Sequence, residues 1–175
     1  LKDIFLSEIT KFLPFYKVSA GLLSSKVIGF TRSKNQKMLP NECLILSSSK
    51  ASLSLMVTES DKFPGDLDAL SKDNWAINRK ILGDHEIELG ETGRYRPHEL
   101  GQQNTRVSFS KGCFKGQEII ARMEYLGKLK KETRLIAHST LQEISEFIII
   151  GRSYHDQDRI FSSCFGKIDR FSEIN

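Results

Sequence analysis

The sequence lacks the residue patterns that mark disulfide-rich and zinc-binding proteins. Its three cysteines, Cys43, Cys113 and Cys164, are odd in number and far apart, and none belongs to a Cys-x-x-Cys pair. We therefore expect reduced thiols, with neither a disulfide framework nor a cysteine zinc site. The four histidines are equally scattered and show no metal-ligand spacing. No metal site is predicted.

Long apolar runs are also missing. The most apolar run, residues 147–150, has the length of a β-strand, whereas a membrane-spanning helix needs about 18 or more apolar residues. Residues 1–4 do not open an apolar region followed by a small-residue cleavage site, so no signal peptide is expected. We therefore expect a cytoplasmic protein without membrane contact. Because the first residue is Leu1 and not Met, we also expect a processed, trimmed or partial chain.

The composition is that of an ordinary globular protein, but its positive charge is unevenly distributed. Hydrophobic residues make up 39% of the chain and charged residues 27%. Residues 106–134 contain eight Lys or Arg against three Glu, so this segment carries +5 and the rest of the chain −1. Such a block favours an anionic partner, either nucleic acid or a carboxylate-rich ligand, although a solvated surface explains it equally well.

The order of apolar positions predicts an α+β fold in which helices mix with antiparallel strands. Helices are expected where apolar residues recur every three or four positions, and strands where short apolar runs lie between turn residues. Residues 90–106 are expected to form a long ordered loop, because they are rich in Gly, Pro and polar side chains. The predicted helices are residues 3–13, 73–82 and 116–127, and the predicted strands are 16–20, 26–30, 43–46, 53–57, 133–137, 147–150 and 160–165.

Two domains are expected, residues 1–127 and residues 128–175. After Gly127 the helical pattern gives way to short strand-like runs, which predicts the start of a separate small β domain. Within the first domain, Asp73 is the predicted N-cap of the helix that carries Trp75, and Gly83 is its predicted left-handed terminator.

Cys113 is the one cysteine whose surroundings predict reactivity. It lies just ahead of the predicted helix 116–127, next to Lys111 and Lys115. A helix N-terminus and neighbouring lysines both favour the thiolate form. Gly112 and Gly116 bracket the cysteine, as expected of a tight, open turn, although an ordinary helix start has the same pattern.

Residues 111–118, Lys-Gly-Cys-Phe-Lys-Gly-Gln-Glu, resemble the signature of the YgfZ-type folate-binding proteins, relatives of the glycine-cleavage T-protein. The resemblance extends over residues 108–122. Upstream, Trp75 lies eight residues before Gly83, as does a folate-site tryptophan in bacterial members, and Tyr95-x-Pro97 matches an aromatic-x-Pro of the family. Phe114 stands where the family usually has tyrosine.

The resemblance implies a T-protein-like folate-binding fold, followed by the start of a C-terminal β-barrel, and a chain without the family's N-terminal portion. It implies tetrahydrofolate or a derivative as cofactor, with Trp75 lining its site and Cys113 as the functional thiol. Iron–sulfur enzymes, including tRNA-modifying ones, are the implied partners, and Cys113 is a candidate for transient contact with an iron–sulfur cluster. The residues expected to shape the motif are Lys111, Gly112, Gly116, Gln117, Glu118 and Arg122, with an ion pair between Glu118 and Arg122.

Two other functions stay open. Aminomethyl transfer to tetrahydrofolate is the enzymatic alternative, but the T-protein relatives lack the Lys-Gly-Cys form of the motif, so a non-enzymatic role is favoured. Direct RNA binding through residues 106–134 is the other alternative, and it predicts an affinity that falls steeply with salt. For Trp75, packing in the core of an amphipathic helix is the alternative to ligand contact.

Overall fold

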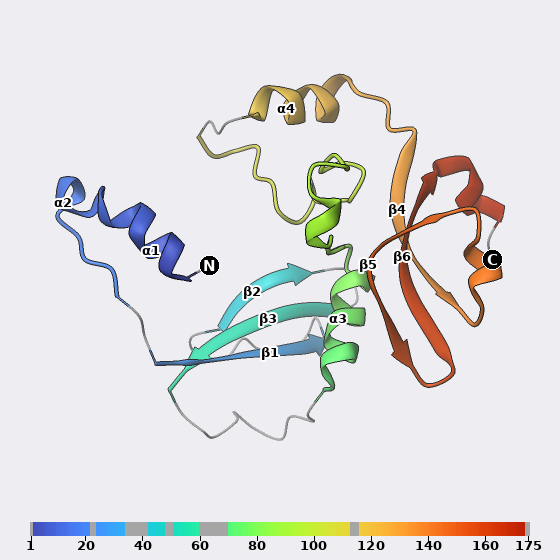
Figure 1. The fold of residues 1–175 in the computed structure, drawn as a ribbon, viewed down its shortest axis with the longest axis horizontal. Helices are drawn as coiled ribbons and strands as arrows, with labels where there is room; N and C mark the ends of the chain where they lie inside the picture. Colours follow the sequence, from blue (N-terminus) through green and yellow to red (C-terminus); the bar gives the residue numbers. More distant parts are fainter. Residues whose placement is uncertain are drawn as a thin grey trace.

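The computed structural model describes residues 2–21, 24–33, 42–47, 51–59, 70–112 and 116–173, and Figure 1 shows their arrangement. These residues form helices, two three-stranded sheets and short 3₁₀ turns. The helices are α1 (Lys2–Thr10), α2 (Leu13–Tyr16), α3 (Lys72–Ile81) and α4 (Gln117–Leu126), and the strands are β1 (Lys26–Ser33), β2 (Glu42–Ser47), β3 (Ala51–Thr58), β4 (Lys131–His138), β5 (Ile148–Asp156) and β6 (Arg159–Lys167). The 3₁₀ turns are η1 (Leu89–Glu91), η2 (Leu141–Ile144) and η3 (Ile168–Glu173).

The first sheet has the order β1-β3-β2, with both pairings antiparallel. Its strands are rich in the apolar and small residues that fit a pleated surface. Phe30, Leu46, Leu53 and Met56 are buried in it. The strands expected at residues 43–46 and 53–57 are present, and residues 43–46 pair with residues 53–55.

The second sheet has the order β4-β6-β5, also antiparallel, and both of its faces are covered. Successive residues of a strand point to opposite faces, so Cys164 and Phe165 of β6 enter different clusters. Cys164 packs with Ile144, Phe147 and Phe171, and the last two rings stack at 4.6 Å. Phe165 packs with Ile150, Leu100 and Tyr95. The second sheet therefore shares a core with the segment around residues 95–100.

Helix α3 connects the two sheets. Ser71 caps it, because the Ser71 hydroxyl accepts a hydrogen bond from the Asn74 N–H at 3.0 Å. The helix contacts both β1 and β5. It ends at Ile81, and Gly83 follows two residues later with a φ of 83°, which favours glycine. The cap is Ser71 and not the expected Asp73, but the helix and its glycine terminator are confirmed.

The mixed α+β character is confirmed, and one of the finer predictions is wrong. Residues 16–20 do not form a strand: α2 ends at Tyr16 and Lys17 follows with a φ of 52°. Pro14 lies in the first turn of α2, where a missing N–H costs nothing. The second sheet is open, and the described residues contain no closed barrel. Among the described helices, none has the length and apolar character required to cross a membrane.

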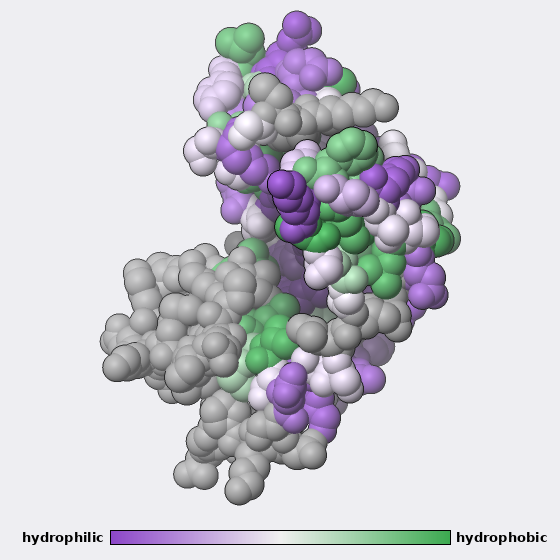
Figure 2. All heavy atoms as spheres, turned by 90° about the vertical axis from the view of Figure 1, so that its left-hand side faces the viewer, coloured by the Kyte–Doolittle hydropathy of each residue, from purple (hydrophilic) through white to green (hydrophobic). Residues whose placement is uncertain are grey.

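The N-terminal helices carry their apolar side chains on the outside. Ile4, Phe5, Phe12, Phe15 and Tyr16 are each more than half exposed. They contribute to the green patches on the face that Figure 2 presents, where they alternate with hydrophilic side chains. The described contacts of α1 and α2 therefore leave most of their apolar surface open to solvent.

Candidate functional site

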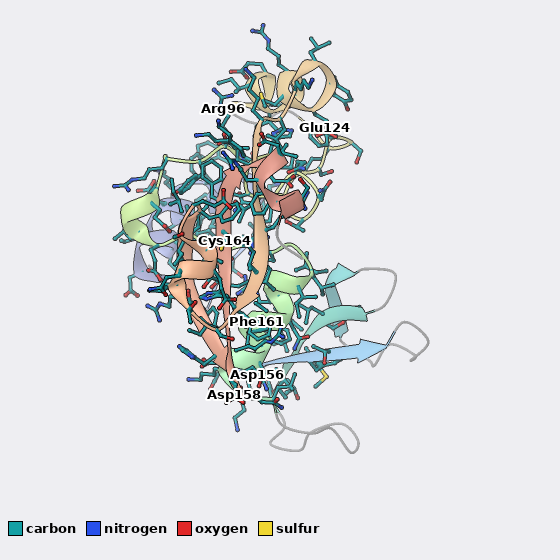
Figure 3. The ribbon with its side chains drawn as sticks, turned by 90° about the vertical axis from the view of Figure 1, so that its right-hand side faces the viewer. Arg96, Glu124, Asp156, Asp158, Phe161 and Cys164 are labelled. Carbon is teal, nitrogen blue, oxygen red and sulfur yellow. The ribbon has the colours of Figure 1, made fainter. Side chains whose placement is uncertain are left out.

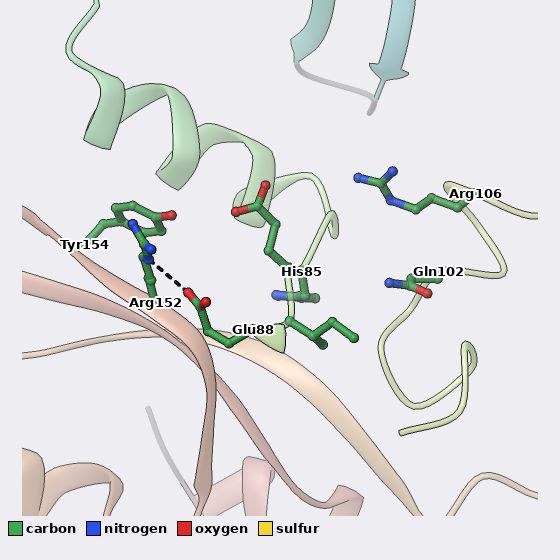
Figure 4. Close-up of a pocket in the computed structure, with 8 residues that line it drawn as sticks. His85, Glu88, Gln102, Arg106, Arg152 and Tyr154 are labelled. Atoms are coloured by element: carbon green, nitrogen blue, oxygen red, sulfur yellow. Dashed lines mark hydrogen bonds and ion pairs between the residues drawn. The ribbon is translucent and has the colours of Figure 1, made fainter. Parts of the chain in front are cut away.

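A polar pocket lies where the C-terminal end of α3, the following residues 84–88, the 102–106 segment and β5 meet (Figure 4). Its volume is about 470 Å³. We call it the junction pocket, because its walls come from both halves of the described structure. It is lined by His85, Glu86, Ile87, Glu88, Gln102, Arg106, Arg152 and Tyr154.

Buried Asp84 organises one wall of the junction pocket. One Asp84 oxygen accepts the Arg79 Nε–H at 2.8 Å, and the other accepts the Arg106 Nε–H at 2.8 Å. Arg79 also pairs with Glu86. Burial by itself lowers the pKa of Arg79, yet its bonds to Asp84 and Glu86 raise it above the ordinary value. This network holds the Arg106 side chain in place at the pocket wall.

A second network lies beneath His85. The Lys80 amine, only 2% exposed, donates to the Ser163 hydroxyl at 2.7 Å, and that oxygen lies 2.9 Å from Nδ1 of His85. The Lys80 nitrogen also lies 5.4 Å from the centre of the Tyr154 ring. A protonated amine can only donate, so the Ser163 hydroxyl is free to donate to Nδ1, which puts the imidazole proton on Nε2.

Burial decides the charge of these groups. Burial lowers the pKa of Lys80 from its ordinary value. Burial and the nearby Lys80 charge lower the pKa of His85 to about 4, so the imidazole is neutral at pH 7. At that pH the junction pocket therefore presents a neutral imidazole beside two guanidinium groups and the carboxyl groups of Glu86 and Glu88.

The outer wall of the junction pocket is more open. Arg152 Nε donates to a Glu88 oxygen at 2.9 Å, and both side chains are exposed, as the dashed line in Figure 4 marks. The Gln102 amide and the Tyr154 ring complete the lining. Guanidinium groups bind carboxylates through paired hydrogen bonds, and amide and imidazole groups bind the polar edges of heterocycles. The junction pocket is therefore chemically suited to an anionic ligand that carries a polar ring.

The predicted thiol, Cys113, lies outside the described residues, as do Phe114 and Lys115. On its two sides, Lys111, Gly112 and Gly116 are described. Gly116 has a φ of 86° and is the N-cap of α4, which explains a glycine there. A side-chain carbon added at Gly112 or Gly116 meets nothing within 4 Å, so both flanks of the motif are open.

The other motif residues lie in the first turns of α4. Gln117 is half-buried, and Glu118 and Arg122 are exposed. The predicted ion pair between Glu118 and Arg122 is absent from the salt bridges of the described residues. Its absence has a simple physical reason, because an exposed pair on a helix gains only about 0.3–0.5 kcal/mol.

Helix α4 is attached to the molecule by residues that the sequence did not single out. Nε2 of buried His98 lies 3.1 Å from a Glu124 oxygen, and an Arg96 nitrogen lies 3.7 Å from the Met123 sulfur. Figure 3 shows Arg96 and Glu124 at the same end of the molecule, beside α4. The rings of Phe109 and Tyr125 meet edge to face at 6.0 Å. These contacts hold the C-terminal end of α4, the helix whose N-terminal part carries the described motif residues from Gln117 on.

Trp75 lies on α3, with its indole against β1. A side-chain carbon added at Gly29 would lie 2.8 Å from the indole ring, so the glycine makes room for Trp75. Trp75 is half-buried and is not among the residues that line the junction pocket. Its described contact is thus a packing contact. In Figure 1, α4 lies at the top of the view, whereas β1 lies toward the bottom.

Known proteins give an independent comparison. A protein of unassigned function from Haemophilus influenzae is 31% identical over 81% of this chain and 51% of its own length. A tRNA-modifying protein YgfZ from Vibrio atlanticus is 25% identical over 82% of this chain and 50% of its own, and one from Colwellia psychrerythraea is 38% identical over 37% of this chain and 20% of its own. No family model and no solved structure matches.

The described structure is of the mixed α+β class, and several of the relatives are named tRNA-modifying proteins. By its similarity to them, the chain belongs to the YgfZ family, as its motif at residues 111–118 indicated. The chain spans about half the length of the Haemophilus and Vibrio relatives that it matches.

Proposed function

We propose that this chain is a folate-binding factor that supports iron–sulfur enzymes and tRNA modification. The observation that carries the proposal is the junction pocket, which gathers two guanidinium groups, an imidazole and an amide from distant parts of the chain. The relatives named as tRNA-modifying proteins supply the tRNA context. In this role the chain assists other enzymes and is not expected to catalyse a reaction by itself.

The chemistry of the junction pocket fits tetrahydrofolate or a derivative. Its volume of about 470 Å³ is in the range of small-molecule sites. Arg106 and Arg152 suit the carboxylates of the glutamate tail, because guanidinium and carboxylate form charge-assisted hydrogen bonds. His85 and Gln102 suit the donor and acceptor edge of the pterin, and the Tyr154 ring offers an apolar face.

Trp75 stays a predicted folate contact. Part of its indole remains accessible beside β1, although the described contact with Gly29 also fits a packing role. Trp75 is the only tryptophan of the chain, so intrinsic fluorescence reports on it alone. If it stacks on the pterin, titration with tetrahydrofolate quenches this signal, and Trp75→Phe weakens binding.

The division of the chain also stays a proposal. We propose that residues 1–127 belong to a T-protein-like folate-binding region and that residues 128–175 begin the C-terminal β-barrel region. The boundary falls between α4 and β4, and the second sheet then packs on the first region through Leu100 and Tyr95. The junction pocket lies across this division, because β5 contributes Arg152 and Tyr154 to it.

A binding experiment tests the folate proposal. Wild-type protein is titrated with 5-formyltetrahydrofolate by isothermal calorimetry, beside Arg152→Gln and the control Arg159→Gln. Arg152 reaches the junction pocket, whereas exposed Arg159 begins β6 and lies outside its lining. Loss of a charge-assisted hydrogen bond is expected to weaken binding about tenfold or more in Arg152→Gln only. Equal affinities in all three proteins would show that folate does not bind in the junction pocket.

The thiol proposal has its own test. We expect Cys113 to react with iodoacetamide faster than Cys164, which is fully buried and whose pKa burial raises to about 11. Alkylation rates at several pH values, read by mass spectrometry, measure this. Cys113→Ser is expected to keep folate affinity but to lose rescue of a tRNA-methylthiolating iron–sulfur enzyme in a strain without the protein. Full rescue by Cys113→Ser would favour aminomethyl transfer or a structural motif.

A further inference from the structure

A second groove lies on another part of the molecule, away from the junction pocket. It runs between residues 93–99 and residues 128–131, the link from α4 to β4, and has a volume of about 580 Å³. None of its lining residues lines the junction pocket. We call it the basic groove, because of the charged residues that line it: Arg94, Arg96, Lys128, Lys130, Lys131 and Glu99.

The single acid of the basic groove is already engaged. A Glu99 oxygen accepts the backbone N–H of Arg96 at 2.9 Å. Arg96 itself contacts the Met123 sulfur, and the Lys131 nitrogen lies 5.6 Å from the centre of the Phe165 ring. Within the described part of the chain, none of the five cations forms a salt bridge.

Most arginines elsewhere in the described structure, by contrast, form salt bridges. Carboxylates pair with Arg79, Arg106, Arg134, Arg152 and Arg170. The basic groove therefore concentrates positive charge that no described carboxylate pairs with. Cations of like sign repel one another, so an external polyanion that neutralises such a cluster gains favourable electrostatic energy there.

We propose that the basic groove binds the phosphate backbone of RNA. This inference rests on the proposed role in tRNA modification for its choice of polyanion. Arginine and lysine side chains on both walls reach phosphate oxygens without reading bases, so the contact is electrostatic and independent of sequence. The groove combines two segments more than thirty residues apart, 93–96 and 128–131, of which only the second belongs to the basic block of the sequence.

The partner favoured by the geometry is RNA and not the polyglutamate tail of folate. The junction pocket has its own guanidinium groups for those carboxylates, and the two sites share no residue. Binding of a folate tail in the basic groove is therefore an alternative outcome of the test. A bound acidic protein is a further alternative, and it would leave tRNA unbound.

The test uses an in-vitro transcribed, fluorescein-labelled tRNA and anisotropy at 50–200 mM salt. Two double charge reversals are compared, Arg94→Glu/Lys130→Glu in the groove and Lys72→Glu/Arg159→Glu outside it, which change the net charge equally. The groove variant is expected to bind at least about tenfold more weakly at 100 mM salt, with a salt slope shallower by about two. The control is expected to stay within about threefold of wild type.

A charge-retaining double variant guards against misfolding. Arg94→Lys/Lys130→Arg keeps both cations and is expected to bind tRNA as wild type does, with an unchanged thermal midpoint. The proposal is overturned if wild-type protein does not bind tRNA, or if the outside variant loses as much affinity as the groove variant.

Folate titrations carried out in parallel test the proposed folate function separately from the RNA inference. Groove variants are expected to retain folate affinity. If wild-type protein binds tRNA through the groove but does not bind 5-formyltetrahydrofolate, the folate proposal fails and the RNA inference stands. If the groove variant weakens binding of a pentaglutamyl folate and leaves tRNA affinity unchanged, the RNA inference fails.

Discussion

The junction pocket and the basic groove both contain arginines, but the two sites differ in whether a carboxylate pairs with them. In the junction pocket, Arg106 is paired with buried Asp84, and Arg152 with Glu88. In the basic groove, Arg94 and Lys130 have no carboxylate partner among the described residues. Paired charges fix side-chain geometry and support the fold, whereas unpaired exposed charges cost little and remain available to a partner. The two sites thus differ in how their cations are held, because carboxylates fix the arginines of the junction pocket and no described carboxylate pairs with the cations of the basic groove.

The sharpest way to break this comparison is to remove Asp84. Asp84 is 2% exposed and accepts hydrogen bonds from both Arg79 and Arg106. Asp84→Ala leaves the Arg79 guanidinium partly buried without its main partner, so the free energy of unfolding is expected to fall by about 3–5 kcal/mol. Urea denaturation at 25 °C measures it. A loss below about 1 kcal/mol would show that the network is not structural.

Acid should destabilise the junction pocket next most strongly. The pKa of His85 is about 4 in the folded chain, against the ordinary 6.5. As the pH falls, the unfolded chain takes up a proton on His85 near pH 6.5, well before the folded chain does. The stability that neutral His85 contributes is therefore complete above pH 6.5 and is lost as the pH falls toward 4. The loss is about 3 kcal/mol. The free energies of unfolding of wild type and His85→Gln, compared at pH 7 and pH 4.5, should differ in slope. Parallel pH profiles of the two proteins would contradict a lowered pKa of His85 in the folded chain.

The variant Lys80→Met tests whether the buried amine of Lys80 raises or lowers the stability of the fold. It is held by Ser163 without a carboxylate bonded to it, and burial lowers its pKa. Replacing it in Lys80→Met removes the cost of burying a charge, so at pH 7 we expect about 1 kcal/mol of added stability. In the wild type, the folded chain releases the Lys80 proton at a lower pH than the unfolded chain, whose Lys80 pKa is near 10.5. The cost of burying the charge disappears over this pH range, so the advantage of Lys80→Met is expected to shrink in alkali. Thermal unfolding at pH 7 and pH 10 measures both effects.

The smallest effect on stability is expected in the basic groove. Arg94 is exposed and makes no salt bridge in the described structure. Arg94→Gln is expected to change the free energy of unfolding by less than about 0.5 kcal/mol, while it weakens tRNA binding. Urea denaturation of this variant is the matched control for Asp84→Ala. A loss comparable to that of Asp84→Ala would erase the distinction between the two sites.

Local patterns in the sequence were good guides to the helices. The spacing of apolar residues predicted α3 and α4, and Gly83 and Gly116 were identified as special positions, both of which have positive φ. The error at residues 16–20 has a local cause, because Pro14 starts a helical turn as readily as it ends one. The N-cap, Ser71 and not Asp73, shows the usual uncertainty of helix ends when several capping residues are close together.

The candidate sites were predicted only in part. The motif and Trp75 were found because they resemble a family, and the block at residues 128–131 because charge can be counted. His85, Lys80 and Ser163 had no such signal, since the hydrogen bonds that join them cross about eighty positions of the chain. His98 was dismissed with the other scattered histidines, yet it pairs with Glu124 on α4.

By itself, the sequence determined the mixed α+β character, most helices and strands, and the YgfZ motif, because apolar period, turn residues and short motifs are local properties. Only the tertiary structure decided which charges are paired. Folding brings Arg106 to Asp84 and Arg152 to Glu88, whereas Arg94 and Lys130 line one groove in which neither forms a salt bridge with a described carboxylate. Electrostatic energy depends on distance in space, and distance along the chain does not reveal it.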